Sequence, residues 1–241
     1  INNQSFTFEK FNRLIAIFIY NIQKSNYSII KLAIDFKLKL DILVAIIGCN
    51  RLNITPIILP PKNKRVSNMN YEQISNADTL IRNKDCIIQL NKDESLEKEA
   101  KIGTVQCILF TSGSEGIPKA VELTYKNIFT SANQWDEILH FSKNDYYLNI
   151  LPLYHIGGLA IFFRSIYYNF VSIVLDYDKE NIVNQVNNNN IDYVSVVPKM
   201  VHDMIENKDL RILSQRIKML IIGGDGVSKY IYDQLVKNNV N

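Results

Sequence analysis

The segment from Thr111 to Lys119 holds three hydroxyl side chains, two glycines and one lysine within nine residues. Small residues in succession allow backbone N–H groups to converge on an anion, and glycine lets the backbone approach it closely. The hydroxyls add hydrogen-bond donors and Lys119 adds positive charge. This composition predicts a phosphate-binding loop, although an exposed loop that binds nothing fits it equally well. The candidate phosphate-binding residues are Thr111, Ser112, Gly113, Ser114, Glu115, Gly116 and Lys119.

Two later turns contain a second set of candidates: His155 within Tyr154–Gly158, and the glycine-rich turn Gly223–Gly226, which includes Gly224 and Asp225. Both turns follow apolar runs typical of strands, and parallel sheets bind ligands at the carboxyl ends of their strands. A lone histidine in a turn is more often structural, and Gly-Gly turns are common. Neither turn is therefore specific by itself.

Arg164 lies on a predicted helix among apolar neighbours, which are Ile161, Phe162, Phe163 and Ile166. A guanidinium in such a setting needs a partner, and its planar fork suits a carboxylate. The alternative is a head group that reaches solvent or pairs with a local carboxylate. Arg164 is therefore a candidate for pairing with a carboxylate.

The elements that must position these residues alternate between helical and extended periodicity, which predicts βαβ units. The expected fold class is α/β, with mostly parallel sheets flanked by helices. We expect helices at 8–22, 38–49, 69–76, 125–140 (with Thr124 as N-cap), 159–168, 181–189, 198–206 and 229–237. We expect strands at 28–34, 55–59, 79–81, 87–90, 105–110, 119–123, 146–151, 170–175, 193–197 and 218–222.

The string Ile108–Val121 resembles the signature of the adenylate-forming enzymes, which include acyl- and aryl-CoA ligases, luciferases and peptide-synthetase adenylation domains. The resemblance implies that the Thr111–Lys119 loop wraps the β- and γ-phosphates of ATP. At Glu115 the family most often has Thr. A carboxylate there must turn outward or share a Mg²⁺ ion with the triphosphate.

Leu151–Leu159 and Ile221–Gly226 resemble two further motifs of the same family, in the same order. They imply that His155 is a catalytic residue beside the acyl site, and that Gly223, Gly224 and Asp225 line the adenine and substrate pocket. Within the family, three segments look like the o-succinylbenzoate–CoA ligases of menaquinone synthesis: Pro152–Leu159, Phe163–Ser165 and Ser195–Met200. Arg164 would then bind the carboxylate that does not react.

The activity implied by the resemblance joins a carboxylic acid to ATP, giving an acyl-adenylate and pyrophosphate, and then transfers the acyl group to the thiol of CoA. The expected ligands are the acid, ATP with Mg²⁺, and CoA, and no metal ligand is assigned. A fatty acyl-CoA or acyl-carrier-protein synthetase is an alternative. So is a nucleotide-binding protein without catalysis.

The composition of the chain bears on its partners, on metal binding and on its compartment. A net charge of +3 gives no argument for nucleic acid or an anionic membrane, and no apolar run approaches the ~18 residues of a membrane span. The three cysteines are far apart, which disfavours zinc and indicates a reduced, cytoplasmic compartment. Homo-oligomerisation stays open.

The 241 residues are expected to form an incomplete N-terminal AMP-binding domain. Its first α/β portion covers about 1–100, and the portion with the phosphate loop covers about 101–241. The small C-terminal domain of the family, with its catalytic lysine, has no counterpart here. The chain alone is therefore expected to be inactive as a ligase.

Overall fold

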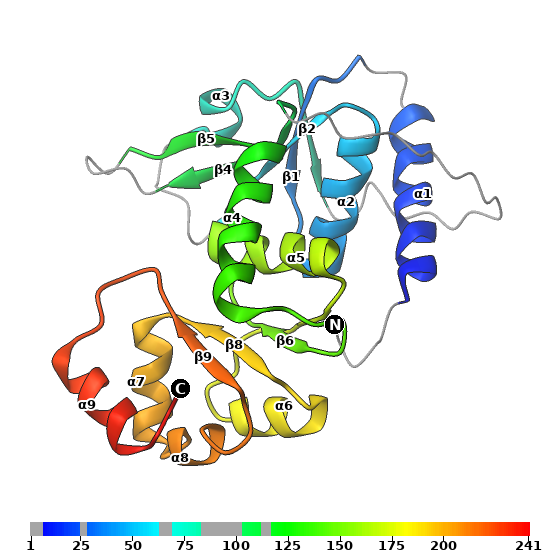
Figure 1. The fold of residues 1–241 in the computed structure, drawn as a ribbon. Helices are drawn as coiled ribbons and strands as arrows, with labels where there is room; N and C mark the ends of the chain where they lie inside the picture. Colours follow the sequence, from blue (N-terminus) through cyan, green and yellow to red (C-terminus); the bar gives the residue numbers. More distant parts are fainter. Residues whose placement is uncertain (1–6, 25–27, 63–68, 83–102, 112–116) are drawn as a thin grey trace. The chain divides into compact units, whose positions relative to one another are not determined.

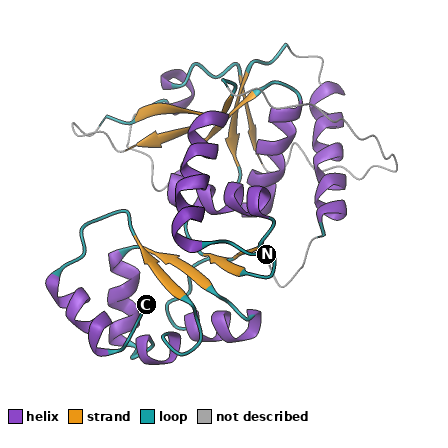
Figure 2. Ribbon diagram, viewed as in Figure 1, coloured by secondary structure: helices purple, strands orange, loops and turns teal. Residues whose placement is uncertain are grey.

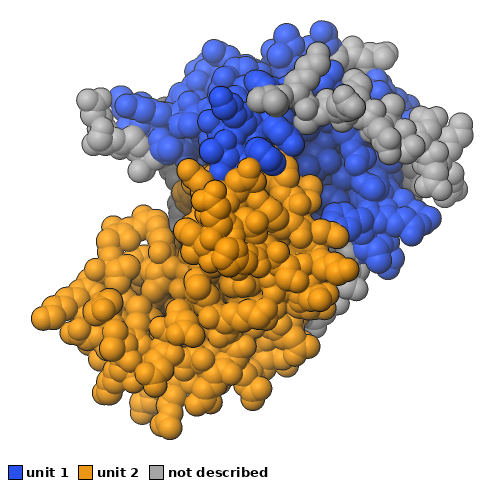
Figure 3. Space-filling model, in the orientation of Figure 1, with its two compact units in different colours: residues 1, 3–130 blue, residues 2, 131–241 orange. Residues whose placement is uncertain are grey.

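The structure, a computed structural model, describes residues 7–24, 28–62, 69–82, 103–111 and 117–241. Contacts divide the chain into two compact units (Figure 3). Unit 1 contains the described residues up to Thr130, and unit 2 runs from Ser131 to Asn241. Each unit has its own β-sheet (Figure 2).

The sheet of unit 1 has the strand order β3-β1-β2-β4-β5 (Figure 1). The pairs β1–β2, β1–β3 and β2–β4 are parallel, whereas β4 and β5 are antiparallel. The strands are β1 (Lys31–Asp35), β2 (Thr55–Ile58), β3 (Thr79–Arg82), β4 (Val105–Thr111) and β5 (Lys119–Thr124). The helices are α1 (Phe8–Lys24), α2 (Lys39–Arg51) and α3 (Tyr71–Ile74), and α4 (Tyr125–Leu139) begins in this unit.

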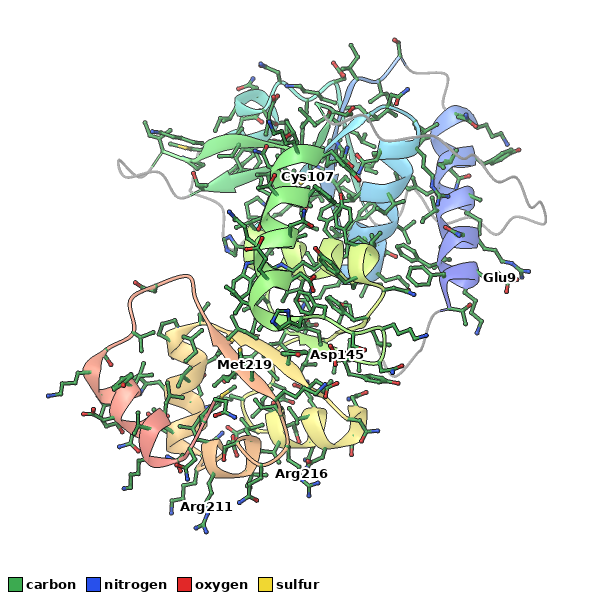
Figure 4. The ribbon with its side chains drawn as sticks, in the orientation of Figure 1. Glu9, Cys107, Asp145, Arg211, Arg216 and Met219 are labelled. Atoms are coloured by element: carbon green, nitrogen blue, oxygen red, sulfur yellow. The ribbon has the colours of Figure 1, made fainter. Side chains whose placement is uncertain are left out.

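Both faces of the central strands in unit 1 are covered. On one face, Ala33, Ile57 and Ile108 pack with Tyr71 and Phe110. On the other, α2 packs against β1, β2 and β4, and α1 packs against α2. Burial on both sides explains the continuous apolar runs of these strands, as is usual for parallel sheets. Cys107 of β4 (Figure 4) belongs to this interior, and burial raises the pKa of its thiol to about 12.

Thr124 joins β5 to α4. Its Oγ1 accepts a hydrogen bond from the Asn127 N–H at 3.2 Å, while Asn127 Oδ1 accepts one from the Thr124 N–H at 2.9 Å. This reciprocal pair satisfies donors that the first turn of the helix would otherwise leave open. The predicted N-cap is therefore confirmed.

Unit 2 contains an all-parallel sheet in the order β7-β6-β8-β9 (Figure 1). Its strands are β6 (Tyr146–Asn149), β7 (Val171–Val174), β8 (Tyr193–Val196) and β9 (Met219–Ile222). Its helices, besides the end of α4, are α5 (Ile156–Tyr168), α6 (Ile182–Asn189), α7 (Pro198–Glu206), α8 (Leu210–Leu213) and α9 (Lys229–Lys237).

Strand alternation sorts the residues of unit 2 into two layers. Leu148 and Val194 face a cluster formed with α6, α7, α8 and α9. Tyr147 and Tyr193 face the opposite side, where they pack with Leu139 of α4 and Ile161 of α5. Because successive side chains of a strand point to opposite faces, Asn149 and Ser195 belong to the α5 side as well. Two polar residues thus lie on the face covered by α5.

The predicted α/β class is confirmed, and the observed strands fall on predicted ones with shifts of a few residues at their ends. Helix α8 was not predicted, since four residues carry too little periodicity to detect. The strand predicted at 87–90 lies outside the described residues. No helix in the described part of the chain is long and apolar enough to cross a membrane.

Candidate functional site

The two ends of the predicted phosphate loop lie opposite each other in unit 1. Thr111, the last residue of β4, is the cross-strand partner of Lys119, the first residue of β5. Directly opposed residues of antiparallel strands project from the same face of the sheet, so the hydroxyl and the ammonium share a face. Both residues are exposed. The pair therefore offers one donor and one positive charge to an anion in solvent.

The predicted residues between these two strand ends lie outside the described residues; they are Ser112, Gly113, Ser114, Glu115 and Gly116.

His155 lies at the carboxyl edge of the sheet in unit 2, in the turn between β6 and α5. It is the N-cap residue of α5, but its side chain makes no capping hydrogen bond. Its ring centroid is 4.4 Å from that of Tyr154. Desolvation lowers the pKa of His155, which favours the neutral imidazole. A neutral ring at this position can accept or donate a hydrogen bond without bringing a charge.

Asn149 and Gly158 hold this turn in place. Asn149 Nδ2 donates to the Gly158 carbonyl at 2.8 Å, and Asn149 is fully buried. A Cβ on Gly158 would lie 2.5 Å from the Pro152 carbonyl oxygen, so only glycine allows this approach. The start of α5 is thus fixed by contacts on two sides.

The Gly223–Asp225 turn lies at the same edge, because β9 is parallel to β6 in one sheet. The Gly223 N–H donates to the Val196 carbonyl at 3.1 Å, which ties the turn to β8. Gly224 has φ +86, a conformation that favours glycine. The Asp225 carboxylate accepts from the Gly226 N–H at 2.7 Å. Both predicted turns of unit 2 therefore meet at one edge of its sheet.

Arg164 is buried in unit 2 with only 7% of its surface exposed. Its guanidinium carbon lies 4.6 Å from the ring centroid of Trp135 on α4, a cation–π contact. Its Nε is buried and has no hydrogen-bond partner, and no carboxylate among the described residues pairs with it. The expectation that Arg164 reaches solvent or a local carboxylate therefore does not fit the described part of the chain.

Lys218, another cation of unit 2, does have carboxylate partners. Its Nζ lies 2.6 Å from Asp145 Oδ1 and 3.1 Å from Asp192 Oδ1, although this lysine is more exposed than Arg164. A buried cation without a counter-charge costs several kcal/mol. Burial accordingly lowers the pKa of Arg164, opposed only by the Tyr147 hydroxyl. The guanidinium is therefore a buried cation whose Nε has no partner among the described residues.

Tyr147, which affects the pKa of this guanidinium, and Ser195, which is hydrogen-bonded to Tyr147, were not predicted as site residues from the sequence. Tyr147 of β6 has no exposed surface, and its hydroxyl oxygen lies 2.7 Å from Ser195 Oγ of β8. The residues are separated by 48 positions in the chain and meet only because β6 and β8 are neighbouring strands. The only signal in the sequence was that residues with polar groups occupy every second position of these two strands, namely Tyr147 and Asn149 in β6, and Tyr193 and Ser195 in β8.

No three His, Cys, Asp or Glu side chains gather as a metal site requires within the ranges that the structure describes. Of the predicted site residues, Thr111 and Lys119 belong to unit 1, whereas His155, Arg164 and Gly223–Asp225 belong to unit 2.

Comparison with known proteins places this geometry in context. The profile of the AMP-binding enzyme family matches residues 40–240. A 2-succinylbenzoate–CoA ligase of Bacillus cereus is 27% identical over 150 residues, which cover 62% of this chain and 31% of that ligase. The match thus spans less than a third of that relative's length.

Two solved structures share the fold. The first is the o-succinylbenzoate CoA synthetase (MenE) of Bacillus subtilis in complex with the acyl-adenylate intermediate OSB-AMP. It is similar with a TM-score of 0.84 at 18% identity, covering 99% of this chain and 67% of that chain. The second is the same synthetase in complex with ATP and magnesium ion, with a TM-score of 0.82, 18% identity, and coverage of 99% and 54%.

Proposed function

Since this chain belongs to the AMP-binding enzyme family, we propose that it is the N-terminal part of a ligase that activates a carboxylic acid with ATP and transfers the acyl group to CoA. In the first step a carboxylate oxygen attacks the α-phosphorus of ATP. The bond between the α-phosphorus and the bridging oxygen breaks, and pyrophosphate leaves with the electron pair. The CoA thiolate then attacks the acyl carbon of the adenylate, and AMP leaves.

The first step needs little acid–base chemistry, because the attacking carboxylate is already a nucleophile. Its barrier comes mainly from bringing two anions together in line, which cationic and hydrogen-bonding groups at the phosphates lower. The Thr111–Lys119 pair at the hairpin end supports this role, since it offers a hydroxyl and an ammonium on one face. Mg²⁺ bound to the triphosphate would supply further positive charge.

The acid that we propose is o-succinylbenzoate, a dicarboxylate of which one carboxylate reacts. The observation that carries this proposal is the buried Arg164 guanidinium with an unpaired Nε. A carboxylate that does not react would neutralise this cation and accept its N–H donors, which is a strong, charge-assisted arrangement. A fatty acid has no second carboxylate and would leave Arg164 buried and unpaired.

The position of Arg164 along α5 places its Cα well behind the carboxyl edge of the sheet. Helix α5 starts beside His155 at the carboxyl edge of the sheet and runs back along β6 and β7, which are parallel. Arg164 lies eight residues beyond Ile156, or about 12 Å along the helix axis at a rise of 1.5 Å per residue. Helical side chains tilt toward the N-terminus of their helix, so we infer that the long Arg164 side chain extends from this depth back toward the edge, where the other carboxylate would react.

The test compares two acids in the complete ligase that we propose contains this chain. Pyrophosphate exchange into ATP is measured with o-succinylbenzoate and with octanoate, for the wild type and for Arg164→Leu. We expect Arg164→Leu to lower kcat/KM for o-succinylbenzoate by about 10- to 150-fold, since a hydrogen bond to a charged group contributes about 1.5–3 kcal/mol. Exchange with octanoate, which starts lower, should change less than about threefold.

Arg211→Leu is the matched control, because Arg211 is an exposed arginine of the same unit and points outward (Figure 4). It should leave both acids unaffected. Equal losses on both acids in Arg164→Leu, or a wild-type preference for octanoate, would exclude o-succinylbenzoate as the substrate. A complete ligase without ATP–pyrophosphate exchange on any acid would contradict the ligase proposal itself.

A further inference from the structure

Asn149 ends strand β6 with a buried amide that is hydrogen-bonded through its nitrogen. The side chain has no exposed surface. Its Nδ2 lies 2.8 Å from the carbonyl oxygen of Gly158 in α5. A carbonyl oxygen can only accept, so the amide nitrogen must face Gly158 and the direction of this hydrogen bond is fixed. The amide oxygen, Oδ1, therefore points elsewhere, where it is buried and has no hydrogen-bond partner among the described residues.

The stability of unit 2 does not explain this amide. A buried acceptor without a donor is destabilising. The Gly158 carbonyl does not need Asn149 either, because α-helical geometry already pairs it with the N–H of Phe162 within α5. A leucine has the same arrangement of side-chain atoms and leaves no polar atom unpaired. The hydrogen bond is therefore better explained by what it holds in place.

The hydrogen bond joins the end of β6 to the first turn of α5, and His155 lies between them in the chain. The His155 N–H donates to the Pro152 carbonyl at 3.2 Å, and the His155 carbonyl accepts from the Leu159 N–H at 3.2 Å. Gly158 approaches the same Pro152 carbonyl so closely that a Cβ would lie 2.5 Å from its oxygen. The backbone of His155 is thus held on both sides, and Asn149 ties this arrangement to the sheet.

The position of this backbone determines the surroundings of the imidazole. The ring centroids of His155 and Tyr154 are 4.4 Å apart. Desolvation lowers the pKa of His155, and no charged group among the described residues contributes to the shift. A neutral imidazole can orient a carboxylate through one N–H, without the stronger attraction of an ion pair that would make the attacking oxygen less nucleophilic. Such a contact requires a ring that stays in one place at the sheet edge.

We propose that Asn149 is a positioning residue that, through the Gly158 carbonyl, fixes the first turn of α5 and so holds the His155 imidazole beside the reacting carboxylate of the acid. This proposal rests on the proposed function. Asn149 need not touch the acid, because it acts through the backbone of the turn. Its distinguishing consequence is that loss of the amide changes the surroundings of His155, and the reaction with them, out of proportion to any change in the stability of unit 2.

The first experiment needs no substrate and uses the 241-residue chain. The imidazole C–H signals of the three histidines are followed by NMR during a pH titration, and the signal of His155 is assigned by its loss in His155→Ala. We expect Asn149→Leu to raise the pKa of His155 toward the ordinary histidine value of about 6.5, because the released turn gives the ring more contact with water.

Ser165→Ala is the matched control. Ser165 is a buried residue of the same helix, and its Oγ donates to the Phe162 carbonyl at 2.7 Å. This variant also removes a hydrogen bond to a backbone carbonyl of α5, but one that does not reach the sheet, so the titration of His155 should keep its wild-type course. Urea denaturation, followed by Trp135 fluorescence, should show that Asn149→Leu leaves unit 2 at least as stable as Ser165→Ala does.

The second experiment is a double-mutant cycle in the complete ligase, with pyrophosphate exchange into ATP measured on o-succinylbenzoate. Asn149→Leu should lower kcat/KM for the acid about fivefold, the effect of one neutral hydrogen bond. In the His155→Ala background the same substitution should change kcat/KM less than about twofold, because a residue that acts through the imidazole has nothing left to position. The KM for ATP should not change. If Asn149→Leu does not fold, Asn149→Ala, which removes the amide without adding atoms, takes its place.

The outcomes separate this proposal from the proposed function. An unchanged titration of His155 in Asn149→Leu, or equal losses in both backgrounds of the cycle, would overturn the positioning role while the ligase proposal stands. Loss of folding in both Asn149→Leu and Asn149→Ala would assign the amide to the stability of unit 2, and would overturn that role as well. If the complete ligase shows no ATP–pyrophosphate exchange on any acid, the proposed function is wrong, and the role of Asn149 in the reaction is overturned with it.

Discussion

The two candidate regions differ in how the chain supplies their positive charge. In unit 1, Lys119 is exposed, and the predicted phosphate-binding residues form one stretch of nine positions. In unit 2, Arg164 is buried, and the side chains that interact with it, Trp135 and Tyr147, come from two separate elements, α4 and β6. An exposed ammonium suits a multiply charged ligand that stays partly hydrated. A buried guanidinium suits a single carboxylate in a fixed place, because electrostatic interactions are stronger away from water.

Lys119→Ala tests whether the exposed region of unit 1 lowers the barrier of adenylate formation rather than contributing to binding of the acid. If Lys119 makes one cationic contact to the phosphates in the transition state, its removal should slow adenylate formation by about 10²-fold, or about 2.7 kcal/mol. Single-turnover adenylate formation in the complete ligase measures this rate. The affinity for o-succinylbenzoate should not change.

Lys126→Ala is the control for this experiment, since Lys126 is an exposed lysine near the start of α4. It should react at the wild-type rate. An unchanged rate in Lys119→Ala, or a loss that appears only as weaker binding of the acid, would remove the distinction between the two regions.

Gly158→Ala tests whether the buried region depends on close packing. A Cβ would lie 2.5 Å from the Pro152 carbonyl oxygen and 2.8 Å from the Leu151 carbonyl oxygen, and both are backbone atoms that cannot move aside easily. We expect unfolding of unit 2 to become easier by about 1–3 kcal/mol, the usual effect of overpacking. Urea denaturation followed by fluorescence measures it, because Trp135 is the only tryptophan and lies in unit 2.

The neighbouring glycine provides the control. A Cβ on Gly157 would meet only the Leu151 Cδ1 atom at 3.3 Å, the end of a flexible side chain. Gly157→Ala should therefore be neutral or stabilising by up to about 1 kcal/mol, because alanine favours the helix. Equal effects of the two variants would show that the close approach at Gly158 does not determine the stability of unit 2.

The contrast between a contiguous loop in unit 1 and a set of dispersed residues in unit 2 also explains which features could be predicted from the sequence. The α/β class follows from alternating periodicities, and the cap at Thr124 follows from local residue types, so both could be predicted. The antiparallel pairing of β4 with β5 is compatible with a short connection but not specified by it. Local patterns thus predict elements and contiguous loops, while strand order depends on contacts between distant segments.

The surroundings of Arg164 illustrate what local patterns omit. Arg164 itself was a candidate because an arginine among apolar residues is unusual. Its cation–π contact with Trp135, and the effect of Tyr147 on its pKa, exist only once α4, α5 and β6 have packed together. In the sequence, Tyr147 resembles any aromatic core residue. Its hydroxyl gains significance from the cation that packing places beside it.

Lys218 offers the smallest and sharpest contrast, since it is a cation of unit 2 that lies close to two carboxylates. The hydrogen bonds to Asp145, which is 2% exposed, and to Asp192 raise the pKa of Lys218 above its ordinary value. Its contribution to stability is therefore fully present below the ordinary lysine pKa of about 10.4, and is lost as the pH rises through the folded-state value. Solvent screens the ammonium, so we expect Lys218→Met to cost about 1 kcal/mol.

The difference in unfolding free energy between wild type and Lys218→Met should thus stay constant from pH 7 to about pH 10 and shrink at higher pH. Urea titrations at several pH values, followed by Trp135 fluorescence, measure it. Arg164→Leu should behave in the opposite sense and leave unit 2 equally stable or more stable at pH 7, because it removes a buried charge without a described counter-ion. If Lys218→Met and Arg164→Leu lower the unfolding free energy of unit 2 by the same amount, Arg164 is stabilised by a partner within the protein. Its guanidinium would then not be available to bind a ligand.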